Sequence, residues 1–329
     1  MKVTSRYTIA ACAIVGFASA TAAGATTISV SSFSPQFVGV DLAKATILSN
    51  ADSASVNTSV AFIERIDLTA PGVGFTTTPP SGSLETTSQS TSQFLQSTGA
   101  QVAINANFFS DVAATPSPEN LIGLAVSNGT VVAPQTFGSN DAAASLVITK
   151  TNTATISPAG ATPIDLSHVF NAVSGNQIVT DGLNTSATTP TGAPHDPFGL
   201  DPRTAIGLSK DGRFLYLIAI DGRQPGYSVG VTTSDEAALM IDLGIFDGLN
   251  LDGGGSTALV QAGAGGSPDP IDSPSGSFGV VERLDGNNLG VFASALPTPE
   301  PSTWAMMLAG FGGLALLARR RAQTLVSAA

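Results

Sequence analysis

The order of apolar and polar positions along the chain predicts many short strands. Phe214 to Ile220 is apolar at nearly every position, which is typical of a central strand covered on both faces. Other runs rich in apolar and β-branched residues are bounded by Gly, Pro, Asn or Ser, as strands usually are. These runs predict strands at 59–68, 101–105, 121–126, 145–149, 177–180, 204–208, 248–251 and 257–261.

Two segments predict helices. Residues 87–97 are followed by Gly99, a residue type that commonly ends a helix. Thr233 and Glu236 have the spacing of a capping box, with Thr233 as the N-cap, and this helix is expected to end at Gly244. Together with the strands, this pattern predicts an α+β fold, a single domain with mixed β-sheets and few helices.

The N-terminal residues 1–25 have the features of a secretory signal. Lys2 and Arg6 supply positive charge, residues 8–18 form a short apolar run, and small residues follow at 23–25. The alternative is a buried N-terminal helix. Export leaves a mature domain that is expected to span residues 26–298, which is long enough to bury a sizeable core.

The C-terminal residues 299–329 have three parts. Pro299-Glu300-Pro301 is followed by a largely apolar stretch at 304–318 and then by three arginines at 319–321. The apolar stretch is short for a spanning helix, which needs about 20 residues, and arginines tend to remain on the cytoplasmic side. The order resembles the PEP-CTERM sorting signal, which implies a transmembrane tail, processing by an exosortase and a Gram-negative, exopolysaccharide-producing host. A plain membrane anchor is the alternative.

Charge and cysteine content exclude several classes of function. Without Lys2, Arg6, Glu300 and the three terminal arginines, 8 Lys+Arg remain against 23 Asp+Glu. So acidic a domain lacks the basic patches on which nucleic-acid binding depends, and no nucleic-acid partner is expected. Cys12 lies in the signal, so the mature domain has no disulfide, no Cys nucleophile and no His/Cys zinc centre.

Four polar segments carry the candidate chemistry. Asn105 begins the first, Asn105-Ala106-Asn107-Phe108-Phe109, and Arg203 is central to the second, Asp201 to Gly207. The third is Asp221-Gly222-Arg223, and the fourth is Asp252 followed by Gly253, Gly254, Gly255, Ser256 and Thr257. Consecutive glycines let the backbone approach a ligand, and turned N–H groups can hold an anion. Arginines grip phosphate oxygens, and paired carboxylates are the usual equipment for cleaving glycosidic bonds.

These segments resemble the phosphodiester glycosidase family, from about Ser59 to Ala293. The motif arginine of the family matches Arg203, its Asp-Gly-Arg matches 221–223 and its Asp-Gly-Gly-Gly-Ser matches 252–256. The closing stretch, 281–291, also resembles the end of the family. The family's Asn-Gly-Gly-Phe-Phe matches 105–109 only in part, because Ala106 and Asn107 replace both glycines.

The resemblance implies hydrolysis of a sugar-1-phosphodiester to free sugar and a phosphomonoester. Arg203, with Arg223, is expected to hold the phosphate, while Asp252 or Asp221 acts as nucleophile or base. Asn105 is expected to orient a sugar hydroxyl, and residues 253–257 are expected to bind substrate. The expected substrate is a sugar phosphodiester, or a surface polysaccharide or glycoconjugate that carries one.

Other functions remain open. The main alternative is a non-catalytic exopolysaccharide-binding or matrix protein with the same fold, and a second is an enzyme for other exopolysaccharide linkages. His168 and His195 are the only histidines, which disfavours a Ser-His-Asp triad. No cofactor and no metal site is predicted. The acidic surface is compatible with bound Ca²⁺, but no segment has the ligand spacing of an EF-hand.

Overall fold

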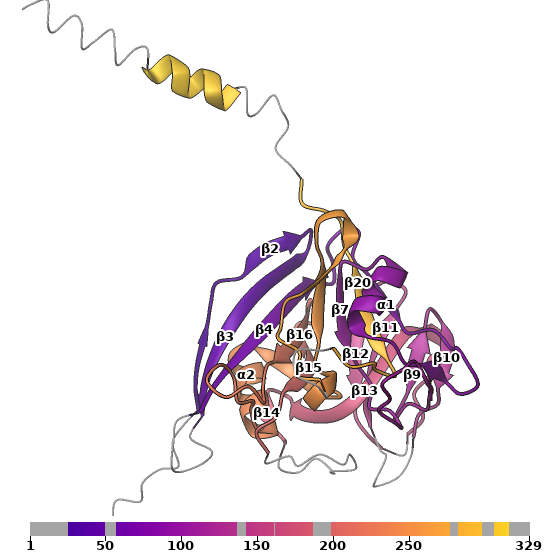
Figure 1. The fold of residues 1–329 in the computed structure, drawn as a ribbon. Coiled ribbons are helices and arrows are strands. Elements are labelled where there is room, and N and C mark those ends of the chain that lie inside the picture. The colour runs from indigo at the N-terminus through magenta and orange to yellow at the C-terminus, as the bar shows by residue number, and fades with distance from the viewer. Residues whose placement is uncertain are drawn as a thin grey trace, which may run out of the picture.

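The computed structural model describes residues 26–49, 57–136, 143–160, 162–186, 199–276, 282–297 and 306–315. The expected signal, 1–25, and His195 lie outside these residues. Strands dominate the described chain (Figure 1). The strands are β1 (Thr27–Val30), β2 (Ser34–Phe37), β3 (Val40–Ser49), β4 (Asn57–Asp67), β5 (Gly74–Thr77), β6 (Thr86–Thr87), β7 (Val102–Asn105), β8 (Pro118–Glu119), β9 (Ala125–Ser127), β10 (Thr130–Ala133), β11 (Ala144–Thr149), β12 (Ala154–Ser157), β13 (Val169–Thr180), β14 (Leu183–Asn184), β15 (Arg203–Ser209), β16 (Phe214–Ile220), β17 (Ile245–Asn250), β18 (Leu259–Ala262), β19 (Pro268–Pro270) and β20 (Asn288–Phe292). The helices are α1 (Thr91–Thr98) and α2 (Thr233–Asp242), with single 3-10 turns η1 (Leu166–His168), η2 (Gly254–Ser256) and η3 (Ala264–Gly266).

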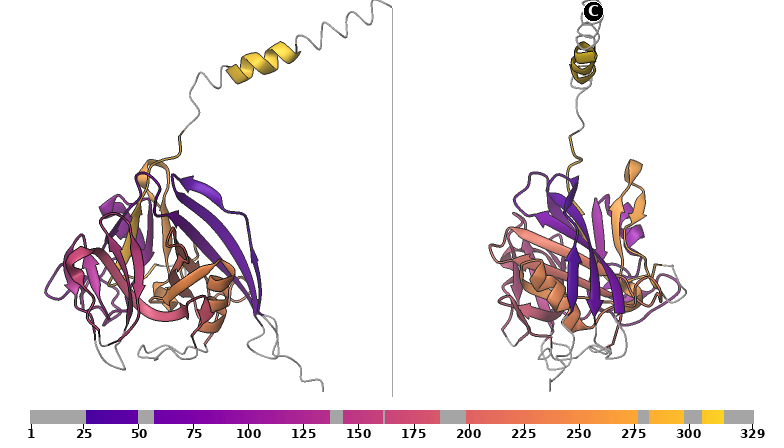
Figure 2. Two further views of the ribbon diagram at one scale, coloured as in Figure 1. Left: turned by 180° about the vertical axis from the view of Figure 1, so that it is seen from behind. Right: turned by 90° about the vertical axis from the view of Figure 1, so that its left-hand side faces the viewer.

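Two antiparallel sheets form the body of the domain. The larger sheet has the central order β1-β3-β4-β16-β15-β17-β13-β11-β12, and the smaller has the order β19-β18-β7-β20-β5. Figures 1 and 2 show the long β3–β4 hairpin at one side of the domain and the β9–β10 hairpin at the other. The large sheet also pairs segments that are far apart in sequence, such as β4 and β16.

Apolar side chains on both faces of β16 explain why this strand is central. Leu215, Leu217 and Ala219 join the core between the two sheets, where Ile104 of β7 also packs. Tyr216, Ile218 and Ile220 face the opposite way, into the core beneath α2. Helix α1 covers the outer face of the smaller sheet with Phe94 and Leu95. The layers run α2, large sheet, small sheet, α1, and the apolar pattern of 214–220 correctly predicted a strand covered on both faces.

The sequence predicted both helices but misplaced their starts. Helix α1 begins after Ser90, which forms a capping box with Gln93, and ends at Gly99 in the left-handed conformation. Helix α2 is capped by Thr232, whose hydroxyl accepts from the N–H of Asp235, and not by Thr233. With Thr232 as the N-cap, the third helical residue is Asp235, so Glu236 lies one position too late to complete a capping box. With so few helices, the fold is a mostly-β single domain with mixed elements, and the α+β class fits it only loosely.

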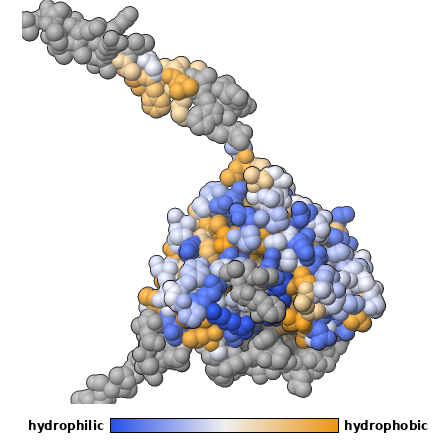
Figure 3. Space-filling view, in the orientation of Figure 1, coloured by the Kyte–Doolittle hydropathy of each residue, from blue (hydrophilic) through white to orange (hydrophobic). Residues whose placement is uncertain are grey.

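The structure describes ten residues of the C-terminal tail. Residues 306–315 form a helix with exposed apolar side chains, which are visible as the hydrophobic part of the extension in Figure 3. No helix in the described ranges is long and apolar enough to cross a membrane.

Candidate active site

Three strands bring the predicted site residues to one edge of the large sheet. Strand β15 runs antiparallel to both β16 and β17, so it begins at the edge where its two neighbours end. Arg203 is the first residue of β15 and is paired with Ile220, the residue before Asp221. Asp252 follows β17 by two residues. The main chains of Arg203, Asp221 and Asp252 therefore lie at the same edge of the sheet, whereas the convergence of their side chains on one ligand stays a prediction.

The glycine segment folds back across the start of β15. The N–H of Gly254 donates to the carbonyl of Pro202 at 2.8 Å, and the N–H of Asp252 donates to the carbonyl of Ala106 at 3.0 Å. Gly254 has a φ of +63°, in the left-handed region that favours glycine. The segment after β7 is thus joined to the same edge as the three strand ends.

Each of the three glycines is packed against a different neighbour. A Cβ at Gly253 would lie 2.8 Å from the carbonyl oxygen of Pro202, and one at Gly254 would lie 3.0 Å from Nη2 of Arg223. A Cβ at Gly255 would lie only 2.4 Å from Nη2 of Arg283. The absence of side chains at 253–255 therefore allows two guanidinium groups to contact this turn.

The arginines at this edge differ in their surroundings. Arg203 is 3% exposed, and its Nε and Nη2 donate to the carbonyls of Val231 and Gly199 at 3.1 and 2.9 Å. Arg223 pairs with Asp201 at 2.9 Å, and its side chain is 45% exposed. Arg203 is held rigidly in the interior, whereas Arg223 reaches the surface.

Asp252 is a buried acid with a perturbed titration. Burial raises the pKa of Asp252 to about 6, while the Ser256 hydroxyl, the Arg283 charge and the Gly253 N–H oppose this rise. Nη1 of Arg283 also donates to the hydroxyl of Ser256 at 3.2 Å. A carboxyl with a pKa near neutrality is suited to exchange protons during a reaction.

Asp221 is bonded to a different set of groups. Its carboxylate accepts from the hydroxyl of Tyr227 at 2.7 Å and from the N–H of Ser273 at 2.9 Å, and burial raises its pKa. Asp272 is also buried, and its pKa is raised well above the usual range by burial and by the charge of Asp221. Asp221 thus belongs to a separate acid cluster at the end of β16.

The remaining predicted residues lie in the interior. The Asn105 amide donates to the carbonyl of Asp252 at 2.6 Å, and its Oδ1 accepts from the Thr204 hydroxyl at 2.9 Å. That hydroxyl also lies 3.2 Å from the Thr257 hydroxyl. Asn105, Ser256 and Thr257 are at most 1% exposed, so their side chains pack on the interior side of the glycine turn rather than facing solvent.

Several acids near the site were not predicted. Asp285 is 1% exposed, and burial together with the charge of Asp252 raises its pKa well above the usual range. Glu236 is buried beside Arg203, whose charge opposes the rise of its pKa to about 8. In the sequence Asp285 stands in Leu-Asp-Gly, which is indistinguishable from a surface turn. Among Asp285, Glu236 and Arg283, only Arg283 was marked in the sequence, because it is one of the few basic residues and belongs to the closing stretch that resembles the family.

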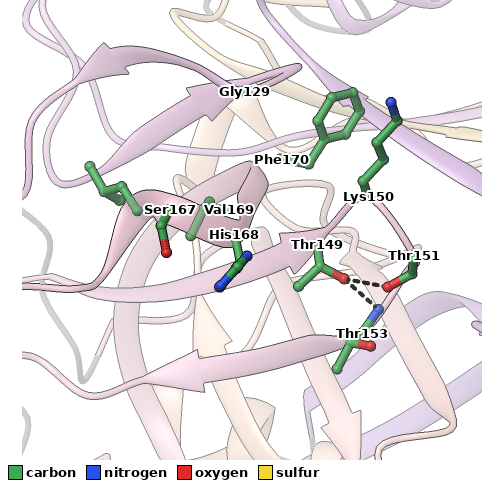
Figure 4. Close-up of a pocket in the computed structure, with 10 residues that line it drawn as sticks. Gly129, Thr149, Lys150, Thr151, Thr153, Ser167, His168, Val169 and Phe170 are labelled. Carbon is green, nitrogen blue, oxygen red and sulfur yellow. Dashed lines mark hydrogen bonds between the residues drawn. The ribbon is translucent and has the colours of Figure 1, made fainter.

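A surface pocket of about 680 Å³ lies elsewhere (Figure 4). Its lining includes Thr149, Lys150, His168 and Phe170, and none of the predicted site residues. Figure 4 shows that the Lys150 amine and the His168 ring point in different directions rather than toward one another. Among the described residues, no group of three or more His, Cys, Asp or Glu could hold a metal ion.

Comparisons with known proteins identify first an exported protein and then its family. The PEP-CTERM protein-sorting motif matches residues 297–321, so the chain is exported and sorted through an exosortase at the inner membrane of a Gram-negative bacterium. The phosphodiester glycosidase model matches residues 98–292. The chain therefore belongs to the phosphodiester glycosidase family. No curated protein matches it.

Solved structures share the fold. The catalytic domain of zebrafish N-acetylglucosamine-1-phosphodiester alpha-N-acetylglucosaminidase, auto-inhibited by its pro-peptide, is 17% identical, with a TM-score of 0.59 over 81% of this chain and 87% of that one. A Burkholderia pseudomallei protein described as exported is 15% identical, with a TM-score of 0.58 over 81% of this chain and 96% of that one. A Synechocystis protein is 16% identical, with a TM-score of 0.51 over 77% of this chain and 62% of that one. At these identities the likeness concerns the fold alone.

Proposed function

We propose that the protein hydrolyses a sugar-1-phosphodiester at the bond between the sugar and oxygen, releasing free sugar and a phosphomonoester. Family membership supports this reaction. The observation that carries it is the meeting of Arg203, the glycine turn and Asp252 at one sheet edge, with Arg223 and Arg283 against the turn. In so acidic a domain, this concentration of guanidinium groups favours an anionic substrate.

The phosphate is held by charge and by backbone. Arg203 supplies a guanidinium fixed by two carbonyl oxygens, and Arg223 supplies a second, more exposed one. Because residues 253–255 lack side chains, their main chain can approach the phosphate closely. Donors that are already in position stabilise the negative charge that develops on the leaving phosphate without reorganising.

The two predicted acids have different parts in this proposal. Asp252 is the nucleophile or base at the anomeric carbon, since it lies beside the turn and titrates near neutrality. Asp221 positions Tyr227 and Ser273 at the end of β16, because its carboxylate accepts hydrogen bonds from both residues. Asn105 donates to the main-chain oxygen of Asp252 and thereby orients the Asp252 carboxyl from the interior of the domain.

The substrate belongs to the cell surface. The zebrafish protein of the same fold is named for action on an N-acetylglucosamine-1-phosphodiester, so a sugar-1-phosphodiester is the substrate class to test first. The sorting motif takes the protein to the envelope, where surface polysaccharides and glycoconjugates are its accessible substrates. The partners are this glycan and the exosortase that processes the tail.

A panel of sugar-1-phosphodiesters tests the proposal. The domain should release free sugar from at least one of them, and Arg203→Ala, Asp221→Asn and Asp252→Asn should each lower turnover about 10²–10³-fold. Arg213→Ala is the control, because Arg213 is exposed and pairs with Asp67 away from this edge. Near-normal activity in all three variants would show that the site is misplaced. Binding to exopolysaccharide without any release of sugar would favour a non-catalytic matrix protein.

A further inference from the structure

Asp285 is a buried acid held in a fixed direction. Its N–H donates to the carbonyl of Gln89 at 3.0 Å, and its carbonyl accepts from the N–H of Gln89 at 3.1 Å. Only 1% of the residue is exposed, yet neither carboxylate oxygen has a hydrogen-bond partner of normal geometry among the described residues. The Ser256 hydroxyl is the one side-chain group that hydrogen-bonds weakly to it and lowers its pKa. Buried polar groups are almost always well paired, so a buried carboxyl with so little hydrogen bonding calls for a functional reason.

The surroundings of Asp285 connect it to Asp252. The Ser256 hydroxyl acts on both carboxyls, and it accepts from Nη1 of Arg283 at 3.2 Å, which leaves its own proton for an acid. The charged groups that face Asp285 are Asp252 from the glycine turn and Arg283 and Glu282 from its own segment. Residues from two distant parts of the chain thus place two carboxyls around one serine.

Two buried carboxyls so placed do not ionise together. Burial and the charge of Asp252 raise the pKa of Asp285 well above the usual range, whereas the pKa of Asp252 rises only to about 6. Asp252 therefore loses its proton before Asp285, which holds its own proton more strongly. Pairs of acids whose environments separate their titrations commonly divide the roles of acid and base between them.

We propose that Asp252 and Asp285 form a catalytic carboxyl pair that carries one proton, with Asp285 as the acid and Asp252 as the base. This inference rests on the proposed function. Asp252 takes a proton from a water molecule, whose oxygen bonds to the anomeric carbon. The bond from that carbon to the phosphate oxygen breaks, its electron pair stays on that oxygen, and Asp285 gives the oxygen its proton. The proton on Asp252 then passes to Asp285, which restores the pair.

Activity against pH, measured on the phosphodiester that the domain cleaves best, tests the pair. For the wild type, kcat/KM should fall on the acid side as Asp252 becomes protonated and on the alkaline side as Asp285 ionises. Asp285→Asn should lower kcat about 10²–10⁴-fold, the usual contribution of acid–base catalysis, and should remove the alkaline fall. Glu64→Gln is the matched control, because Glu64 is another acid whose burial raises its pKa to about 8, and its partners Gln261 and Asp41 are not site residues. It should leave the profile of kcat/KM unchanged.

A second substrate separates proton donation from a structural role. A glycosyl fluoride of the same sugar needs little protonation to leave, so Asp285→Asn should retain much more activity on it than on the phosphodiester. Equal losses on both substrates, or a wild-type profile in Asp285→Asn, would overturn the pair. A wild type that cleaves no sugar phosphodiester would instead overturn the proposed function, so the two failures are distinguishable.

Discussion

The side-chain amide of Asn105 donates to the main-chain oxygen of Asp252 at 2.6 Å, and so joins the end of β7 in the small sheet to the reactive edge of the large one. The Oδ1 atom of Asn105 accepts from the Thr204 hydroxyl and from the N–H of Ala258 at 2.9 and 3.2 Å. Asn105 therefore connects the β7 end, β15 and the glycine turn. This buried amide therefore helps to hold Asp252 in position, together with the bond from the Asp252 N–H to the carbonyl of Ala106.

Truncation of Asn105 should impair catalysis as well as folding. Asn105→Ala leaves three buried groups without their partner, which costs about 1–3 kcal/mol for each unpaired group, and it releases Asp252 from its position. Turnover by the folded protein should fall about 10²-fold, the usual result of misplacing a reacting group by about 1 Å. Urea unfolding and steady-state kinetics measure the two effects.

Asn171→Ala is the matched control for that variant. Asn171 is also a buried amide, whose Nδ2 donates to the carbonyl of Phe75 and whose Oδ1 accepts from the N–H of Asn128. Its loss should destabilise the fold to a similar extent while the folded fraction keeps normal turnover. Equal turnover in the two variants would mean that Asn105 has only a structural role.

A methyl group at Gly255 should displace Arg283. The new Cβ would stand 2.4 Å from Nη2, closer than real contacts allow, so the guanidinium must move away from Ser256 and Asp252. We expect Gly255→Ala to lower kcat/KM about 10–100-fold with little change in the circular dichroism spectrum. Gly160→Ala is the control, because nothing lies within 4 Å of a Cβ at that position. Normal kinetics in Gly255→Ala would show that Arg283 is not needed where it stands.

Removal of the Arg283 charge should move the acid limb of the pH profile. Asp252 is active as the carboxylate, so kcat/KM should fall about tenfold per pH unit below its pKa of about 6. Arg283 lowers that pKa, so Arg283→Gln should shift the limb to higher pH, whereas Arg213→Gln should not. A limb that stays in place in Arg283→Gln would mean that another group sets it.

Two buried glutamates should make the fold less stable as pH rises. Burial raises the pKa of both Glu64 and Glu236 to about 8, so each keeps its proton in the folded state after the unfolded chain has ionised. Their contribution is complete below the unfolded value, near 4.5, and is lost as pH rises toward about 8. In Glu64→Gln and in Glu236→Gln, the free energy of unfolding should fall less as pH rises from about 4.5 to about 8. The difference from the wild type should be on the order of 3 kcal/mol for each variant.

Urea titrations across this pH range measure that effect, and Asp67→Asn tests its sign. The hydrogen bond from Arg213 lowers the pKa of Asp67 to about 2, so its stabilisation is present at neutral pH and is lost only in strong acid. Asp67→Asn should therefore weaken the fold at neutral pH, opposite to the glutamate variants. A wild-type stability that is flat from about pH 5 to 8 would contradict the buried glutamates.

The sequence predicted the strands that repeat an apolar pattern but not those that depend on their partners. Residues 214–220 are buried on both faces, so composition alone identified β16. Strand β20 was not predicted as a strand, because Asn288 is buried by its neighbours and bonds to Thr91, which no local pattern encodes. The same limit applied to the site. Arg203 and Asp252 carried family motifs, whereas Asp285 and Glu236 acquire their chemistry only from burial in the folded chain.

Hydrolysis in water enriched in oxygen-18 tests the central claim most directly. If Arg203, the glycine turn and Asp252 direct attack at the anomeric carbon, the heavy oxygen enters the released sugar and the phosphomonoester remains unlabelled. Mass spectrometry of both products in a single turnover distinguishes the outcomes. Label found in the phosphomonoester would mean attack at phosphorus, and the protein would then be a phosphodiesterase rather than a glycosidase.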